Sequence, residues 1–407
     1  MSQLRQRLSA LRQQSGAQAA AGVPPPIAER IRRARIGHKR PPDNDPSDLA
    51  ATLAQAVGGE AIGPGVLRIT TQVPLRSNHG DWCLHALLHS PRSLPAAIDV
   101  AANGLLFFDT ETTGLAGGSG TLAFMVGFAA IRGDCLRVDQ YLLSSFAGES
   151  AMLRALCEHT SSAQHLVSFN GKCFDAPLMA TRARLNGVTL GFDDLAHIDL
   201  LYPLRTAFAS RWPDCRLASA EARLLGFVRC DDLPGAEAPQ AWFDYVHRGD
   251  VEALARVVEH NRWDLVSLAA LLPALDRTFA EPHRYGADVG AVARAHLRRG
   301  QTHRAQQLLD TDGAWQSESA CLALAASLRR DGDLDGALRL WKRLTRQGSA
   351  RAAEYLAKYY EHVERDYIRA LQLTQRLPEG PTRHARAQRL RRKMKPQGIR
   401  VRVTQLD

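Results

Sequence analysis

The sequence predicts an α/β domain, built on a mixed β-sheet flanked by helices, followed by an all-α region of helical repeats. Three observations support this fold class. Short apolar runs separated by turns alternate with helical patterns between residues 100 and 280. A helix-pair pattern recurs at intervals of 32 residues after residue 290. The 407 residues, 45% of them hydrophobic, supply apolar material for about two or three folded units.

The sequence of residues 1–48 predicts a basic, loosely ordered N-terminal lead. They contain the break Pro24-Pro25-Pro26 and a second basic helical stretch, Ile27–Ile36. The α/β domain is expected over residues 49–280. Its first feature is the alternating run Val66–Val73, which predicts an N-terminal edge strand.

The middle of this domain predicts an antiparallel meander, because three apolar runs are joined by short turns. The three runs are Leu105–Phe108, Leu122–Ile131 and Leu136–Leu143. A helix, a strand and another helix follow, at Glu149–His159, His165–Phe169 and Asp175–Leu185. A strongly helical stretch, Val251–Leu275, closes the domain.

Residues 281–380 predict helical repeats. Gly300 and Gly332 are 32 residues apart, as are Ala305 and Ala337 within the same recurring pattern. Helix pairs of this length resemble tetratricopeptide units, in which small residues allow paired helices to pack closely. An ordinary helical bundle with accidental internal similarity is the alternative. Residues 381–407 predict a basic C-terminal tail.

Charge is concentrated at the two ends of the chain. Residues 1–40 and 381–407 each carry nine Lys or Arg against one acid, whereas residues 41–380 have a net charge of −6. This distribution predicts a polyanionic partner held by the basic ends, although such ends also serve solubility. Seven scattered cysteines without metal-ligand spacing predict reduced thiols and a cytoplasmic protein, and no apolar stretch is long enough for a membrane span.

Two carboxylates end the apolar run at Leu105–Phe108. Asp109 and Glu111 are two residues apart on a predicted strand, so both can face one divalent cation. A third acid, Asp175, follows the turn at Asn170-Gly171 and opens a helix. Taken alone, Asp175 fits a helix N-cap better than a metal ligand, and the two roles are compatible.

A further pair lies in the late helix. His260 and Asp264 are four residues apart and therefore project from one face of that helix. One of them could activate a water while the other holds a metal, although an isolated pair at this spacing is more often a surface pair. Lys172 could contact a phosphate or remain a solvated turn residue.

The combined order Asp-x-Glu, Asn-x-x-x-Phe-Asp and His-x-x-x-Asp resembles the DEDD-type 3′–5′ exonucleases of the ribonuclease H-like superfamily. The closest likeness is to their YprB-like branch, whose nuclease domain is often followed by helical repeats. The resemblance implies a ribonuclease H-like fold and assigns Asp109, Glu111, Asp175 and Asp264 as ligands of two Mg²⁺ or Mn²⁺ ions. It assigns His260 as the general base. In His-type members the His usually precedes the last Asp by five positions, whereas His260 precedes Asp264 by four, so the orientation of His260 toward the water stays open.

The implied chemistry is hydrolysis of phosphodiester bonds in single-stranded DNA or RNA. Charge builds on the attacking and leaving oxygens, and two hard cations roughly 4 Å apart stabilise both and require oxygen ligands. Nothing in the sequence separates DNA from RNA. Two alternatives stay open: a structure-specific endonuclease using the same metals, and a catalytically silent adaptor. The helical repeats could also recruit a protein partner.

Overall fold

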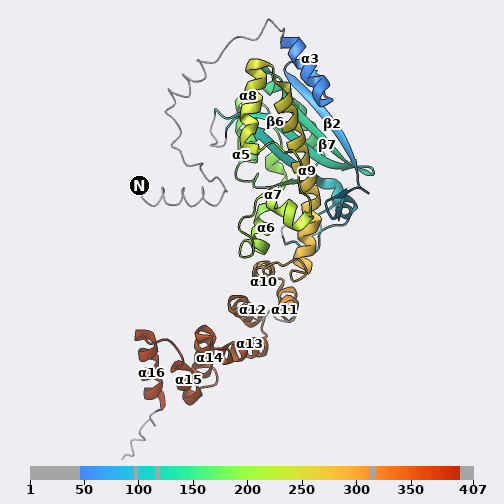
Figure 1. Cartoon of the computed structure of the whole chain (residues 1–407). Helices are drawn as coiled ribbons and strands as arrows, with labels where there is room; N and C mark the ends of the chain where they lie inside the picture. The colour runs from blue at the N-terminus through green and yellow to red at the C-terminus, as the bar shows by residue number, and fades with distance from the viewer. Residues whose placement is uncertain (1–45, 96–99, 115–119, 311–316, 395–407) are drawn as a thin grey trace, which may run out of the picture. The chain divides into compact units, whose positions relative to one another are not determined.

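A computed structural model describes residues 46–95, 100–114, 120–310 and 317–394. The chain divides into two compact units between Ala287 and Asp288, and Figure 1 traces the elements of each. Most of the predicted N-terminal lead, including its second basic helix, lies outside the described residues. The same is true of the end of the predicted C-terminal tail.

The first unit is built on a seven-stranded mixed sheet. The strand order is β1-β2-β7-β6-β5-β8-β9, antiparallel from β1 to β5 and parallel from β5 to β9. The strands are β1 (Glu60–Gly63), β2 (Val66–Pro74), β5 (Leu105–Thr112), β6 (Ala123–Arg132), β7 (Cys135–Leu143), β8 (His165–Ser168) and β9 (Ala196–Asp199). A small hairpin adds β3 (Asn78–His79) and β4 (Trp82–Cys83). The predicted meander is confirmed as β5, β6 and β7.

The edge-strand prediction for Val66–Val73 is wrong. This run forms β2, which pairs with β7 on one side and with the short strand β1 on the other. The edge is therefore Glu60–Gly63, a run of four mostly exposed residues that is too short to signal a strand by alternation.

Helices cover both faces of the sheet. In chain order, those of the first unit are α3 (Pro46–Val57), α4 (Glu149–Ser161), α5 (Asp175–Leu185), α6 (Leu201–Phe208), α7 (Leu217–Ala220), α8 (Ala238–Arg248) and α9 (Val251–Ala280). Neighbouring residues on a strand face opposite ways. Gly127 on β6 faces α9, whereas Phe128 packs beside His159 of α4 on the other face. The sheet is thus sandwiched between α9 and α4.

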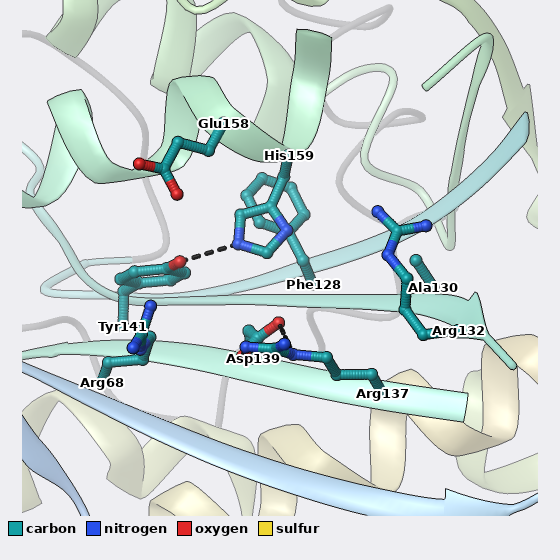
Figure 2. A pocket seen from close by; sticks show the side chains of 9 residues that line it. All are labelled: Arg68, Phe128, Ala130, Arg132, Arg137, Asp139, Tyr141, Glu158 and His159. Atoms are coloured by element: carbon teal, nitrogen blue, oxygen red, sulfur yellow. Dashed lines mark hydrogen bonds and ion pairs between the residues drawn. The ribbon is translucent and has the colours of Figure 1, made fainter. Parts of the chain in front are cut away.

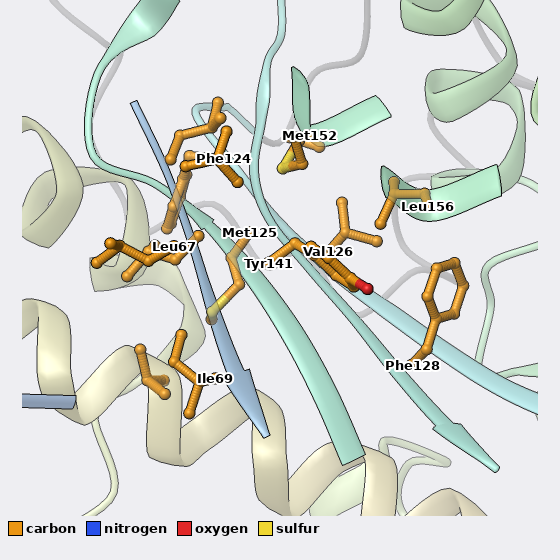
Figure 3. Close-up of a cluster of buried hydrophobic side chains, with 14 of the residues drawn as sticks. Leu67, Ile69, Phe124, Met125, Val126, Phe128, Tyr141, Met152 and Leu156 are labelled. Atoms are coloured by element: carbon orange, nitrogen blue, oxygen red, sulfur yellow. The ribbon is translucent and has the colours of Figure 1, made fainter. Parts of the chain in front are cut away.

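Large apolar side chains fill the space around this sheet. Figure 3 shows part of the cluster, in which side chains from β2, β6 and β7 meet those of α4. The labelled members are Leu67, Ile69, Phe124, Met125, Val126, Phe128, Tyr141, Met152 and Leu156. Phe124 and Phe128 are fully buried, which makes both core residues. Burial of this kind stabilises a fold by about 25 cal/mol per Å² of apolar surface and holds the acid-bearing strand rigidly.

The second unit consists of packed helix pairs. Its helices are α10 (Val289–Arg298), α11 (Thr302–Asp310), α12 (Glu318–Arg330), α13 (Leu334–Arg346), α14 (Ala350–His362), α15 (Tyr367–Thr374) and α16 (Pro381–Met394). Gly300 and Gly332 lie between paired helices with φ of +72° and +88°, where glycine is favoured. Ala305 and Ala337 are completely buried, as close helix packing requires. The predicted order of a mixed sheet with helices followed by an all-helical region is confirmed. No helix among the described residues is long and apolar enough to cross a membrane.

Candidate active site

Two acidic side chains on β5 face helix α9. Asp109 and Glu111 are two residues apart, so they leave the strand on the same face. The partner of Asp109 on β6 is Gly127, where an added Cβ would lie 2.3 Å from Asn261 Oδ1 and 2.5 Å from Leu265 Cδ1. The absence of a side chain at Gly127 therefore allows α9 to lie close to the acids.

Asn261 fixes the Asp109 carboxylate from α9. Its Nδ2 donates to Asp109 Oδ2 at 2.8 Å, and its Oδ1 accepts from Gln140 Nε2 at 2.9 Å. Asn261 is completely buried, so these hydrogen bonds replace the water it has lost. The sequence prediction missed this residue. Its one signal is a polar side chain four positions before Leu265 on the apolar face of the helix.

The same helix brings His260 and Asp264 to Glu111. His260 Nε2 lies 3.5 Å from Asp264 Oδ2 and 4.0 Å from Glu111 Oε1. One ligand atom from each of these three residues lies within 4.8 Å of the others, which is the spacing of a shared cation site. Three of the five predicted residues are thus within reach of one ion.

Asp175 approaches from the first turn of α5. Its Oδ1 accepts a hydrogen bond from Thr110, the residue between the two strand acids. Phe174, not Asp175, holds the N-cap position, so the capping role considered for Asp175 is wrong. The preceding turn is held by Asp199 of β9, whose carboxylate accepts from the backbone N–H of Asn170 at 2.8 Å and of Lys172 at 3.2 Å. Asp199 is therefore a satisfied structural acid that places the turn.

The acids repel one another in a buried setting. Burial, and then the charges of Asp264 and Asp175, raise the pKa of both Asp109 and Glu111 well above its ordinary range. Burial also raises the pKa of Asp175 to about 6, although the Thr110 hydrogen bond opposes the change. Clustered oxygen donors fit a hard divalent cation. Glu111, His260 and Asp264 could hold one, and the buried carboxylates of Asp109 and Asp175 interact electrostatically with this group.

Arg229, which the sequence prediction missed, partly neutralises this cluster. Its guanidinium binds Glu221 through two hydrogen bonds, at 2.6 and 2.9 Å, and also forms ion pairs with Asp264 and, at 3.2 Å, with Asp232. Burial alone would lower the pKa of Arg229, but Asp264 and Glu221 raise it above its ordinary value. Arg229 lies in a loop without periodic pattern, so nothing in the sequence marked it.

Asp232 orients His260. Its Oδ1 lies 2.6 Å from His260 Nδ1, and an ionised carboxylate can only accept, so Nδ1 donates its proton to Asp232. Arg229 Nη1 lies 3.2 Å from this nitrogen and 3.2 Å from Asp232 Oδ2, and it pairs with the carboxylate. In the neutral ring the other nitrogen, Nε2, carries no proton, and it faces Glu111 and Asp264. The carboxylate of Asp232 therefore orients the His260 ring and favours the tautomer whose proton is on Nδ1.

We expect Asp232→Asn to lower the turnover of the reaction proposed below by roughly 10–100-fold, the usual cost of losing a carboxylate behind a histidine. Binding of Mn²⁺, measured by calorimetry, should change little because Asp232 is not among the predicted ligands. The neighbouring Asp231→Asn is the matched control, since Asp231 is exposed and has positive φ, which Asn tolerates. Equal activity of the two variants would remove Asp232 from the site.

A separate polar cavity of about 170 Å³ lies between the sheet and α4 (Figure 2). It contains three arginines, but two of these are paired, Arg137 with Asp139 and Arg68 with Glu60. Tyr141 and His159 bond each other across it at 2.7 Å. Its residues leave β6 and β7 on the face opposite Asn261 and the strand acids, so it is separate from the acid cluster.

The sheet topology and the acid cluster define a class of protein, the ribonuclease H superfamily. A model of the RNase_H_2 family of this superfamily matches residues 106–275, which span every residue of the cluster. The chain is also 31% identical over 311 residues to the "Uncharacterized protein YprB" of Bacillus subtilis (strain 168), covering 72% of this chain and 75% of that protein. The chain belongs to the YprB family.

One solved structure matches part of this chain. It is the family B DNA polymerase of the hyperthermophilic archaeon Pyrobaculum calidifontis, with 13% sequence identity and a TM-score of 0.33. The match covers 74% of this chain and 38% of the polymerase chain, so this chain corresponds to well under half of that protein.

Proposed function

We propose that this protein is a metal-dependent 3′–5′ exonuclease that hydrolyses phosphodiester bonds of single-stranded DNA or RNA. The observation that carries the proposal is the convergence of Glu111, His260 and Asp264 within 4.8 Å, beside the buried carboxylates of Asp109 and Asp175. Phosphate esters are anions, so a cluster of acids suits them only with cations bound between. The polarity and the single-strand preference rest on the resemblance to DEDD-type enzymes.

Each residue then has a distinct task. The four carboxylates of Asp109, Glu111, Asp175 and Asp264 would hold two Mg²⁺ or Mn²⁺ ions, and these ions would supply Lewis acidity. His260 Nε2 accepts the proton of the attacking water, while Asp232 stabilises the imidazolium that results. Asn261 keeps the Asp109 carboxylate turned toward the site.

We also propose limits for the domains of this chain. Residues 49–280 form the nuclease domain after the lead at 1–48, and residues 281–380 form tetratricopeptide-like repeats before the tail at 381–407. In support, the family match ends at residue 275 and the compact units divide after Ala287.

The test uses purified protein and 5′-labelled single strands of DNA and RNA, with Mg²⁺, Mn²⁺ or EDTA. We expect a ladder that shortens from the 3′ end with either metal and intact strands in EDTA. Discrete internal cuts would replace the exonuclease with an endonuclease on the same site. Intact strands that shift in a native gel would show an adaptor without catalysis.

A further inference from the structure

Divided at Asp288, the net positive charge of this protein falls to its second unit. Residues 288–407 contain 24 Lys or Arg against 13 Asp or Glu, a net charge of +11. Residues 1–287 contain 28 basic against 29 acidic residues, a net charge of −1. Within the first unit, residues 1–40 carry +8 and residues 41–287 carry −9, so long-range attraction for a polyanion comes from the N-terminal lead and from the helical unit.

Residues 381–407 contribute +8 of this excess, and a groove formed by α13, α14 and α15 presents a separate local cluster of cations. The groove has a volume of about 480 Å³, and four cationic side chains line it with no acid among the lining residues. The four are Lys342, Arg346, Arg369 and Arg376. Lys342, Arg346 and Arg376 form no ion pair with any residue that the structure describes. By contrast, Arg389 and Lys393 on α16 are both paired with Glu361.

The wall of the groove is partly apolar. Leu356, Leu373 and the half-buried Tyr360 line it, and the Arg369 guanidinium lies 5.7 Å from the centre of the Tyr360 ring.

We propose that this groove binds single-stranded nucleic acid, with the three unpaired cations on successive phosphates and a base against Tyr360. Cations that follow a backbone, with an aromatic face between them, are the usual means of binding a single strand without reading its sequence. The unit also carries residues 381–407, whose net charge is +8, and this total positive charge favours a continuous polyanion over a short acidic peptide. The inference rests on the proposed function, since the ligand is the polymer that the acid cluster would cut.

The decisive measurement is binding of a 5′-fluorescein-labelled 30-residue oligothymidylate by anisotropy, in EDTA, to full-length protein carrying Asp109→Asn. We expect the triple variant Lys342→Gln, Arg346→Gln, Arg376→Gln to weaken binding by about tenfold or more. The slope of log affinity against log salt should fall by about 2, because three single-strand phosphate contacts are lost. All three side chains are exposed, so the variant should fold.

The matched control is the triple variant Arg329→Gln, Arg330→Gln, Arg351→Gln, which removes the same charge from exposed positions outside the groove. An equal loss in both triples, or no change in the groove triple, would overturn the inference. A different pair of results would also overturn the inference: a polyglutamate peptide displaces the oligothymidylate, and the groove triple variant still binds the oligothymidylate normally. That pair would indicate an acidic protein partner.

Cleavage separates this inference from the proposed function. In protein with Asp109 intact, the groove triple should keep its turnover on a tetranucleotide and lose efficiency on the 30-residue strand. If no strand is cut but the groove triple still loses affinity, the proposed function fails and the groove inference stands. If strands are cut and the groove triple binds them normally, the groove inference fails and the proposed function stands.

Discussion

Asp109→Asn should abolish metal-dependent cleavage and, in the absence of metal, raise the stability of the fold. The substitution removes one ligand charge, and metal stabilisation of a transition state amounts to several kcal/mol, so we expect a loss of roughly 10³-fold. It keeps the shape of the side chain and an oxygen that can accept from Asn261. The gain in stability follows because the variant relieves the repulsion that Asp109 experiences from Asp264, Asp175 and Glu111.

The sign of the pH dependence follows from the raised pKa of Asp109. In the folded protein this carboxyl keeps its proton to higher pH than in the unfolded chain, whose value is about 3.9. The folded state therefore binds more protons between the two values, and its stability falls as pH rises through that range. The stability difference between Asp109→Asn and the original protein in EDTA should thus grow from pH 4 to pH 8.

Thermal unfolding in EDTA and in Mn²⁺ measures both parts of this prediction. Mn²⁺ should raise the Tm of the original protein more than that of the variant, since a ligand stabilises the state that binds it. Asp193→Asn is the control, because Asp193 is an exposed acid of the same unit, outside the cluster. A variant that still cuts nucleic acid, or one that is less stable than the original protein in EDTA at pH 8, would contradict this account of Asp109.

Gly127→Ala should damage the site through the backbone, without changing any candidate ligand. The new Cβ would lie 2.3 Å from Asn261 Oδ1 and 2.5 Å from Leu265 Cδ1, so α9 must move away from β6. Overpacking of a well-packed core costs about 1–3 kcal/mol. This movement would break the hydrogen bond from Asn261 to Asp109. It would also displace His260 and Asp264, which lie on the same helix, so cleavage should fall by about 100-fold.

Gly63→Ala is the matched control for this prediction. Gly63 lies on β1 of the same sheet without positive φ, and an added Cβ would meet Ala151 Cβ at 3.5 Å, an ordinary contact. Denaturant unfolding and the strand assay, applied to both variants, give the comparison. If Gly127→Ala matched Gly63→Ala in stability and in activity, the close approach of α9 would not be needed for the site.

The sequence predicted the strands and helices that leave a pattern of apolar and turn residues within a short stretch of chain. The apolar runs at β5, β6 and β7 and the helix beginning at Asp175 were recognised because burial and turn residues leave periodic signals. It failed at β1, which is short and mostly exposed and is a strand only because β2 pairs with it. Sheet order depends on such long-range pairing, which no local period encodes.

The candidate ligands were predictable from the sequence, but the residues that hold them in place were not. The spacing of Asp109 to Glu111 and of His260 to Asp264 is short, so strand and helix geometry alone placed each pair on one face. Arg229 and Asp232 could not be found because their roles come from ion pairs with residues 35 and 28 positions later in the chain, Asp264 and His260. Their chemistry exists only after the loop is folded against α9.

What the sequence alone determined was which side chains were available and which of them shared a face, since a strand or helix imposes its period wherever it forms. Only the tertiary structure decided that Glu111 of a strand meets His260 and Asp264 of a helix about 150 residues later in the chain. It also decided that Asp232 sets the tautomer of His260 and that Gly127 permits the contact. The physical reason is that packing distance and burial, which set both metal affinity and proton position, arise only when distant segments are brought together.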